Sequence, residues 1–290
     1  MDFDPSLYPT GLCEQMEPLV ARVLAGNPSP YTYTGTQTYI VGNQTDRAVI
    51  DPGPAIDAHI DAILAAVGDA RISAIMCTHT HRDHSPAAAP LAARTGAPII
   101  GCAPLVLADD GPRADESFDK HYRPDRILAD GETVAGDGWT IEAVATPGHT
   151  SNHLCLAVRE SGALFTGDHV MAWSTSVIVP PDGNMADYMA SLQKIYERDD
   201  KVYYPAHGKK VPNPRQLVRG MMGHRKQRER QIVKLLQAGP AAIVDMVPQM
   251  YKGLDPRLKG AAGQSVRAHL LDLVDRGVVT LSGEVWSMAE

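Results

Sequence analysis

The stretch RISAIMCTHTHRDHSP, residues 71–86, indicates the fold more directly than any other segment. Its first half, the apolar run from Ile72 to Cys77, is typical of a buried strand. Four side chains of metal-ligand type then fall within six positions: His79, His81, Asp83 and His84. The Ser-Pro pair that follows opens an Ala-rich segment, Pro86–Arg94, which predicts a helix with proline in its first turn. Three imidazoles and a carboxylate on a short loop between a strand and a helix indicate a metal site.

The spacing of these ligands fits two cations rather than one. Alternate residues of an extended segment point the same way, so His79 and His81 suit one cation. Asp83 and His84 turn toward the start of the helix and suit a second cation.

The pattern Thr-His-x-His-x-Asp-His resembles the signature of the metallo-β-lactamase superfamily of metal-dependent hydrolases. That family supplies three further ligands, each just beyond a strand, and the matching segments here are TPGHT with His149, FTGD with Asp168, and YYPAHG with His207. The resemblance implies that His79, His81 and His149 hold one metal, and that Asp83, His84 and His207 hold the other. It implies that Asp168 bridges the two. Seven nitrogen and oxygen ligands without cysteine suit two Zn²⁺ ions, with Mn²⁺ or Fe²⁺ as alternatives.

Composition fits an α/β enzyme. With 290 residues, 44% of them hydrophobic, the chain can form a large core. Strand-like and helix-like segments alternate through residue 101, which predicts α/β layering, and the resemblance implies an αββα sandwich. The four scattered cysteines show no paired spacing that would favour an oxidising compartment. Because no stretch has the length of a membrane span and the N-terminus lacks an apolar signal core, we expect a cytoplasmic enzyme without membrane contact.

The C-terminal part differs in charge and in pattern. Residues 1–214 carry 15 Lys and Arg against 27 Asp and Glu, a net charge of −12, whereas residues 215–290 carry 12 against 7, a net charge of +5. This change predicts a catalytic domain over residues 1–213 and a second domain over residues 214–290. Its expected helices, Gln216–Leu236, Ala241–Tyr251 and Gln264–Val274, and a terminal hairpin predict a winged helix, as in the lactamase-β-2-like branch of the superfamily.

A winged helix raises the question of nucleic-acid binding. The expected recognition helix carries Asp272 and Asp275, which repel phosphate. Four basic residues cluster on the preceding helix instead: Arg225, Lys226, Arg228 and Arg230. We therefore expect the domain to cover the pocket or to form a homodimer contact, and nucleic acid stays the alternative partner.

Residues outside the ligand motifs are candidates for substrate contact. Tyr31, with Tyr33 and Thr36, follows a proline-rich entry and would line a pocket mouth or pack as a strand face. Trp173 and Thr175 follow Asp168 closely in sequence and are candidates for substrate binding. The polar loop 108–126 would form either a substrate wall or a solvated excursion.

The remaining histidines are assigned to structural roles. His153 and His169 adjoin ligands and are expected to support or pack against them. Four others lack ligand-type neighbours and are expected on the surface: His59, His121, His224 and His269.

The ligand set predicts hydrolysis. Two bridged metals would lower the pKa of a bridging water, and the resulting hydroxide would be the nucleophile, with Asp83 as the catalytic residue that orients it or moves its proton. The set resembles glyoxalase II and its thioesterase relatives. Dedicated β-lactamases of the superfamily generally lack the bridging aspartate, so Asp168 disfavours β-lactam hydrolysis. We predict a small-molecule ester, thioester or related acyl substrate. The alternative is single-strand endoribonuclease activity, and a metal-dependent DNA-binding regulator is a weaker one.

Overall fold

The structure, a computed structural model, describes residues 8–106 and 118–289. These residues form two compact units, neither of which is continuous in sequence. The first unit comprises the described residues of 1–146, 152–174 and 199–214, and the second comprises 147–151, 175–198 and 215–289. Two short segments of the predicted catalytic region thus cluster with the C-terminal residues. The single boundary between residues 213 and 214 stays a prediction.

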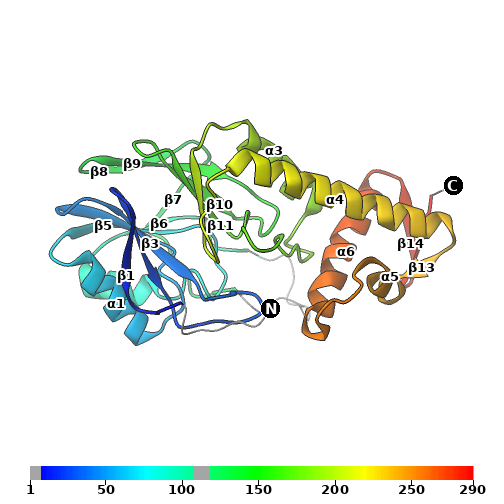
Figure 1. The fold of residues 1–290 in the computed structure, drawn as a ribbon, viewed down its shortest axis with the longest axis horizontal. Coiled ribbons are helices and arrows are strands. Elements are labelled where there is room, and N and C mark those ends of the chain that lie inside the picture. The colour runs from blue at the N-terminus through cyan, green and yellow to red at the C-terminus, as the bar shows by residue number, and fades with distance from the viewer. Residues whose placement is uncertain (1–7, 107–117, 290) are drawn as a thin grey trace. The chain divides into compact units, whose positions relative to one another are not determined.

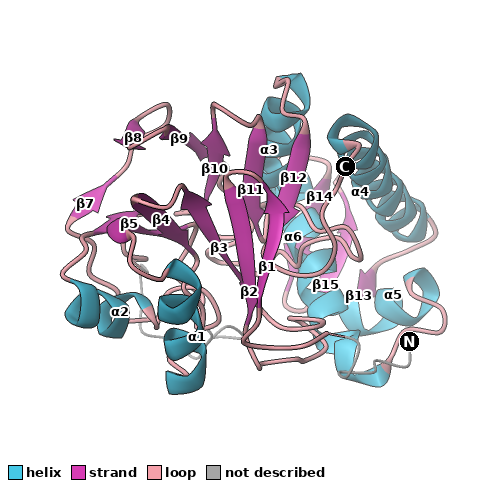
Figure 2. Ribbon diagram, turned by 60° about the vertical axis from the view of Figure 1, so that its left-hand side comes forward, coloured by secondary structure: helices cyan, strands magenta, loops and turns pink. Residues whose placement is uncertain are grey.

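A seven-stranded sheet in the first unit contains β5 (Arg71–Cys77), the strand that precedes the histidine-rich loop (Figures 1 and 2). Its strands, in order, are β1 (Cys13–Glu17), β2 (Val20–Leu24), β3 (Gln37–Gly42), β4 (Asp46–Ile50), β5 (Arg71–Cys77), β6 (Ile99–Gly101) and β7 (Arg126–Ile127). Strands β1 to β4 pair antiparallel, and β4 to β7 pair parallel. Parallel neighbours need a crossover connection, which α1 (Asp57–Val67) and α2 (Ala88–Thr95) provide around β5. The strand and helix predicted on either side of the histidine-rich loop are therefore confirmed.

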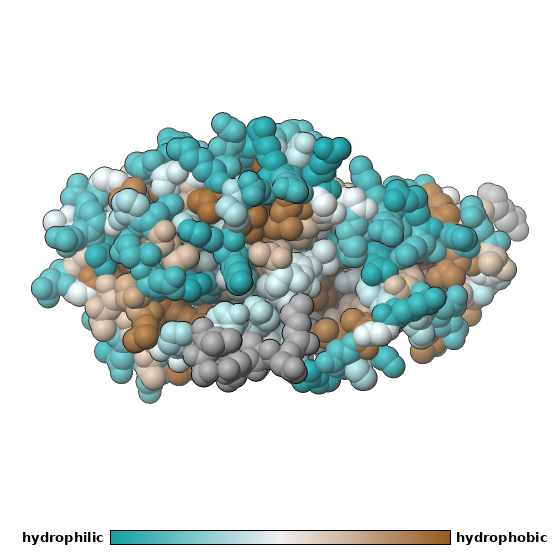
Figure 3. Space-filling model, viewed as in Figure 1, coloured by the Kyte–Doolittle hydropathy of each residue, from teal (hydrophilic) through white to brown (hydrophobic). Residues whose placement is uncertain are grey.

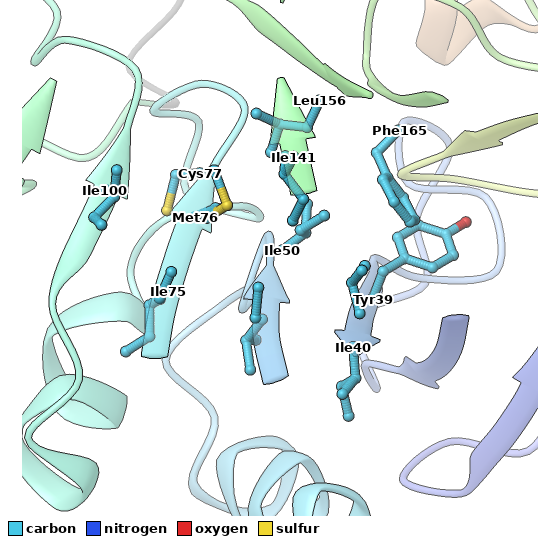
Figure 4. Packing of buried hydrophobic residues seen from close by; sticks show 14 of the residues in the cluster. Tyr39, Ile40, Ile50, Ile75, Met76, Cys77, Ile100, Ile141, Leu156 and Phe165 are labelled. Carbon is cyan, nitrogen blue, oxygen red and sulfur yellow. The ribbon is translucent and has the colours of Figure 1, made fainter. Parts of the chain in front are cut away.

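A second sheet in the same unit has five strands. Its order is β12 (Val202–Pro205), β11 (Ala163–Gly167), β10 (Leu154–Val158), β9 (Trp139–Ala145) and β8 (Thr133–Gly136). All pairs are antiparallel except β11 with β12. Apolar side chains of both sheets form one core (Figure 4). At its centre the ring centroids of Tyr39 and Phe165 lie 4.8 Å apart, so the two sheets pack face to face.

The second unit is built from helices and a small sheet. Its elements are α3 (Met185–Glu197), α4 (Pro214–Gln237), β13 (Ala241–Ala242), α5 (Ile243–Met250), a 3₁₀ turn (Pro256–Leu258), α6 (Lys259–Asp275), β14 (Val279–Ser282) and β15 (Val285–Met288). A separate core includes Leu236 of α4, Met246 of α5, Leu270 of α6 and Trp286 of β15. Helices α4, α5 and α6, together with the terminal hairpin of β14 and β15, confirm the predicted winged helix.

One predicted helix boundary was wrong. Helix α6 begins at Lys259, five residues before the predicted start at Gln264, although Gly260 and Gly263 have low helix propensity. Burial of Ala262 and Val266 in the core of the second unit outweighs that loss. Tertiary packing, which a local pattern does not contain, therefore sets this boundary.

Two histidines expected on the surface are buried. His59 is 3% exposed and its Nε2 lies 2.8 Å from Thr38 Oγ1, and His269 is 2% exposed on α6. Burial lowers the pKa of His59 to about 4. Burial, with the nearby Arg225, lowers the pKa of His269 to about 3. Both rings pack as neutral core residues, a role that sequence spacing does not reveal, whereas His121 is exposed as predicted.

Hydrophilic residues predominate on the face shown in Figure 3, and hydrophobic residues are scattered among them. Scattered apolar residues are normal on a protein surface. Among the described helices, none combines the length and hydropathy needed to cross a bilayer.

Candidate metal centre

Six of the seven predicted ligands lie in the first unit, beyond the ends of three strands. His79 and His81 follow β5 directly, with Asp83 and His84 in the turn that leads toward α2. Asp168 follows β11, and His207 follows its parallel neighbour β12. Parallel pairing brings the carboxyl ends of β11 and β12 to the same edge of the sheet. The loops that follow these strands therefore place Asp168 and His207 at that edge.

These six side chains form two groups of potential ligand atoms. The ligand atoms of His79, His81 and Asp168 lie within 4.8 Å of one another, and the same holds for Asp83, His84 and His207. The Asp168 carboxylate also reaches the second group. Its Oδ1 is 3.3 Å from His207 Nε2 and 3.7 Å from His84 Nε2.

Partners behind the rings fix which nitrogen faces the centre. His84 Nδ1 lies 3.0 Å from the carboxylate of Asp51, and His207 Nδ1 lies 3.2 Å from the carbonyl of Gly35. A ring that donates from Nδ1 keeps the lone pair on Nε2, the form that binds a metal. Both Nε2 atoms lie beside Asp83 Oδ2, at 3.3 and 3.1 Å.

Asp51 is the supporting residue that the sequence did not single out. Its carboxylate accepts hydrogen bonds from Thr78 N at 2.7 Å and Thr78 Oγ1 at 2.8 Å, besides facing His84. Its φ of 47° is unusual for a residue other than glycine and is typical of functional sites. The one sequence signal was the Asp-Pro-Gly at the end of β4, which turn chemistry explains equally well.

The carboxylates govern the charge of this centre. Burial would lower the pKa of His84, but the carboxylates of Asp83, Asp168 and Asp51 outweigh burial and raise it well above the usual range. The pKa of His207 is raised against burial by Asp168 and Asp83. Burial would raise the pKa of Asp83, yet His84 and His207 hold it well below its ordinary value. A buried cluster of this kind favours bound positive charge.

The donor set fits a divalent cation. Imidazole nitrogens and carboxylate oxygens gather from both sheets, and the rings of His79, His84 and His207 are at most 1% exposed. Buried charged and polar groups need partners, and a divalent cation between them supplies one.

The seventh predicted ligand, His149, belongs to the second unit. Its Nδ1 donates to the carbonyl of Val177, 2.7 Å away, which leaves Nε2 as the possible ligand atom. The neighbours of its five-residue segment, Thr146 and Asn152, both belong to the first unit. Its place in the metal centre stays a prediction.

Of the two supporting histidines, His153 contacts a candidate ligand. Its Nε2 accepts a hydrogen bond from Asp168 N at 3.3 Å, and its Nδ1 lies 2.9 Å from Thr146 Oγ1. His169 is fully buried. The supporting and packing roles predicted for this pair fit these positions.

The predicted substrate-contact residues occupy different environments. Tyr31 is 55% exposed, whereas Thr36 is fully buried and therefore does not line a pocket mouth. Trp173 stacks on Tyr33, with ring centroids 5.0 Å apart. Thr175 belongs to the second unit, so its role stays a prediction.

The predicted substrate wall is described only in part, because residues 107–117 lie outside the described residues. Its described end adjoins the ligand loop. Asp119 N donates to the carbonyl of Thr80 at 2.6 Å, and the Asp119 carboxylate accepts from Ser85 Oγ at 3.1 Å.

Comparisons with known proteins agree with this geometry. A family model for the metallo-β-lactamase superfamily matches residues 31–207, and one for the β-lactamase-associated winged-helix domain matches residues 243–286. The β-lactamase-like protein 2 homolog of Caenorhabditis elegans is 31% identical over 279 residues, which cover 95% of this chain and 90% of the relative. The atrochrysone carboxyl ACP thioesterase of Aspergillus fumigatus is 34% identical over 225 residues, covering 77% of this chain and 66% of the relative.

Solved structures share the fold at lower identity. A β-lactamase domain protein from Burkholderia ambifaria has a TM-score of 0.79 at 20% identity, covering 97% of this chain and 94% of that one. A metallo-β-lactamase family protein from Thermus thermophilus has a TM-score of 0.75 at 19% identity, covering 94% of this chain and 100% of that one. The family match over more than half of the sequence shows that this chain is a metallo-β-lactamase superfamily hydrolase with a C-terminal winged-helix domain.

Proposed function

We propose that this protein is a dinuclear metal-dependent hydrolase that cleaves a thioester or a related acyl ester. The observation that carries the proposal is the position of Asp168, whose carboxylate lies within 4 Å of the Nε2 atoms of His84 and His207 while grouping with His79 and His81. A carboxylate within reach of both ligand groups suits a bridge between two cations.

The proposed first site consists of His79, His81 and His149, and the second of Asp83, His84 and His207. His149 is included because its segment is only five residues long and both flanking residues belong to the unit that carries the other ligands. Two Zn²⁺ ions suit the nitrogen and oxygen donors, with Mn²⁺ or Fe²⁺ as alternatives.

The bound cations would supply Lewis acidity and a water of lowered pKa. The protein's own residues would set the geometry. Asp51 and Gly35 hold the rings of His84 and His207 with Nε2 toward the centre. Asp83, which lies between those rings, is the residue proposed to orient the attacking water and to move its proton.

A cavity lined in part by the residue after His207 supports an acyl substrate. It measures about 500 Å³, within the size range of small-molecule sites. The residues that line it include Leu24, Tyr33, Thr34, Gly208 and Lys209. Gly208 directly follows His207, so a group bound in this cavity would lie next to the peptide of a proposed metal ligand. The lining combines aromatic and aliphatic side chains with Glu14, Arg22 and Lys209, so it suits a substrate that joins an apolar acyl chain to a polar or charged arm.

The basic residues of α4 do not favour the RNA alternative. Arg225 is 2% exposed, and the guanidinium of Arg228 lies over the ring of Tyr251 at 4.2 Å, so neither presents a free charge to phosphate. Lys226 and Arg230 are exposed. The names of relatives also favour a thioester over RNA, because several of these proteins are named as atrochrysone carboxyl ACP thioesterases. A lid or homodimer role for the winged helix stays a prediction.

The proposal is tested by metal analysis and a substrate screen on one preparation. We expect about two transition-metal ions per chain, and metal-dependent hydrolysis of acyl-CoA or acyl carrier protein thioesters that exceeds hydrolysis of a β-lactam or a single-stranded RNA. Protein without bound metal that gains no activity from zinc or manganese would overturn the proposal. Cleavage of RNA in preference to every thioester would replace it with the endoribonuclease.

A further inference from the structure

The segment that carries His149 is anchored to α3 of the second unit. The Gly148 carbonyl accepts a hydrogen bond from Asn184 N, 2.9 Å away, at the residue that caps α3. Gly148 has a φ of 132°, and a Cβ there would lie 2.3 Å from the backbone nitrogen of Tyr188. Only glycine permits this approach, so the position of His149 depends on the start of α3.

The orientation of the His149 ring depends on another part of the same unit. Its Nδ1 lies 2.7 Å from the carbonyl of Val177, in the segment between residues 175 and 179 that contains no helix or strand. Irregular backbone has no hydrogen-bond ladder to fix it, so its carbonyl directions depend on side chains that hold it.

Arg225 of α4 holds that segment. It donates to the carbonyl of Ser176, the residue before Val177, and its guanidinium lies 5.2 Å from the ring centroid of Tyr188. The Tyr188 hydroxyl in turn lies 3.4 Å from Ser176 Oγ. Among the described residues no carboxylate pairs with Arg225, which is 2% exposed. Burying a guanidinium without a counter-ion is costly, so its contacts with Ser176 and Tyr188 need a role that offsets this cost.

We propose that Arg225 is a positioning residue for the metal centre. By fixing the Ser176 carbonyl it holds the neighbouring Val177 carbonyl, which accepts from His149 Nδ1 and directs Nε2 outward as a ligand. A residue of the long helix α4, whose C-terminal half belongs to the winged-helix core, thereby supports a metal ligand. This inference rests on the proposed function, in which His149 is one of three histidine ligands to the first metal.

The test compares Arg225 with a matched arginine one turn along α4. Arg228 also donates to a backbone carbonyl, that of Met250, and also lies over a tyrosine ring, that of Tyr251. Arg225→Met and Arg228→Met therefore remove the same kinds of contact. Zinc affinity is measured for both ions by chelator competition, and His149 is followed by NMR of its ring nitrogens. We expect Arg225→Met to lower the affinity for one zinc ion about 10- to 100-fold, which is typical when a group that orients a metal-bound histidine is removed.

Arg228→Met should leave both zinc affinities within about twofold of the parent, and Arg225→Lys should recover part of the affinity lost in Arg225→Met because it keeps a donor and a charge. Should Arg225→Met fail to fold, Arg225→Gln replaces it, with an expected loss of about tenfold. Unchanged zinc affinity and unchanged His149 ring signals in the Arg225 variant would overturn the inference, as would an equal loss in the Arg228 variant.

A His149→Ala variant separates this inference from the function on which it rests. If His149→Ala loses one zinc and Arg225→Met does not, the role of Arg225 is wrong and the ligand set stands. If His149→Ala keeps both zinc ions at parent affinity, the proposed ligand set itself is wrong.

Discussion

Each unit contains a pair of histidines among charged groups, and the two pairs differ in the sign of that charge. In the first unit His84 and His207 lie beside Asp83 and Asp168, which raise both pKa values against burial. In the second unit burial lowers the pKa values of His224 and His269, and Arg225 lowers them further.

The difference shows why one pair suits a cation site and the other does not. Neither His224 nor His269 belongs to a group of potential metal ligands among the described residues. Two histidines in one unit are therefore insufficient to form a cation site. Carboxylates on neighbouring loops create the field that favours bound cations, and nearby arginines create the opposite field.

The largest effect should come from removing the carboxylate nearest both ligand groups. Asp168→Ala should reduce thioester hydrolysis to background and lower the occupancy of both metals, because the proposed bridge is lost. His84→Ala should lower mainly the occupancy of the second metal. Metal content per chain and turnover would be measured on each variant, with Asp272→Ala in the second unit as the control that keeps both metals. Full activity in Asp168→Ala would show that the proposed bridge is wrong.

Removing the charge of Asp51, whose carboxylate faces His84 Nδ1, should have a smaller effect on metal binding. Asp51→Asn should lower the affinity for one metal about 10- to 100-fold, because the amide no longer offers the charge that orients and polarises the His84 ring. Asp46→Asn is the matched control, since Asp46 is also a buried carboxylate that accepts hydrogen bonds, from Ser73 and Asp137. Equal losses of metal in the two variants would mean that Asp51 acts only on general stability.

The core around His269 in the second unit should respond to acid. The folded pKa of His269 is about 3 and the unfolded value is about 6.5, so the unfolded chain binds more protons between these pH values. The stabilising contribution is therefore complete above about pH 6.5 and is lost as pH falls toward 3. At pH 5 the loss should be about 2 kcal/mol of unfolding free energy.

Denaturant unfolding of the second unit at several pH values measures this loss. His269→Gln should flatten the pH dependence between about pH 6.5 and pH 4, whereas His121→Gln, which alters an exposed ring, should leave it unchanged. An identical slope in the parent and in His269→Gln would contradict the assignment of a neutral, buried His269.

The smallest effect concerns the exposed charges of α4. Replacing Lys226 and Arg230 by glutamine should change thioester turnover less than about twofold, because solvent-exposed charges are largely screened at ordinary ionic strength. If RNA were the substrate, the logarithm of its binding constant would fall linearly with the logarithm of salt concentration. Each lost phosphate contact would make that slope shallower by about 0.7. A salt-sensitive RNA affinity that collapses in this double variant, together with metal-dependent RNA cleavage, would reverse the ranking of the two functions.

The sequence alone determined the features that local chemistry encodes. The apolar run Ile72–Cys77, the histidine-rich turn behind it and the proline at the helix start predicted a strand, a loop and a helix, and all three are present. His79, His81, Asp83 and His84 could be named because side chains of this type are rare at such density, whereas His149, Asp168 and His207 were named from the resemblance to the family signature. The apolar spacing of the C-terminal helices predicted helices because a helix repeats its buried face every three to four residues, and these helices with the terminal hairpin predicted the winged helix.

Contacts between groups that are far apart in sequence depend on the folded chain. Asp51 and His84 are 33 residues apart in sequence, and Gly35 and His207 are 172 apart, so no local pattern could show that one orients the other. The same holds for Arg225, which composition placed in a basic surface cluster and which packing buries against Ser176 and Tyr188. Local pattern sets what each segment can form, whereas the charge and burial around a side chain come from segments that only the folded chain brings together.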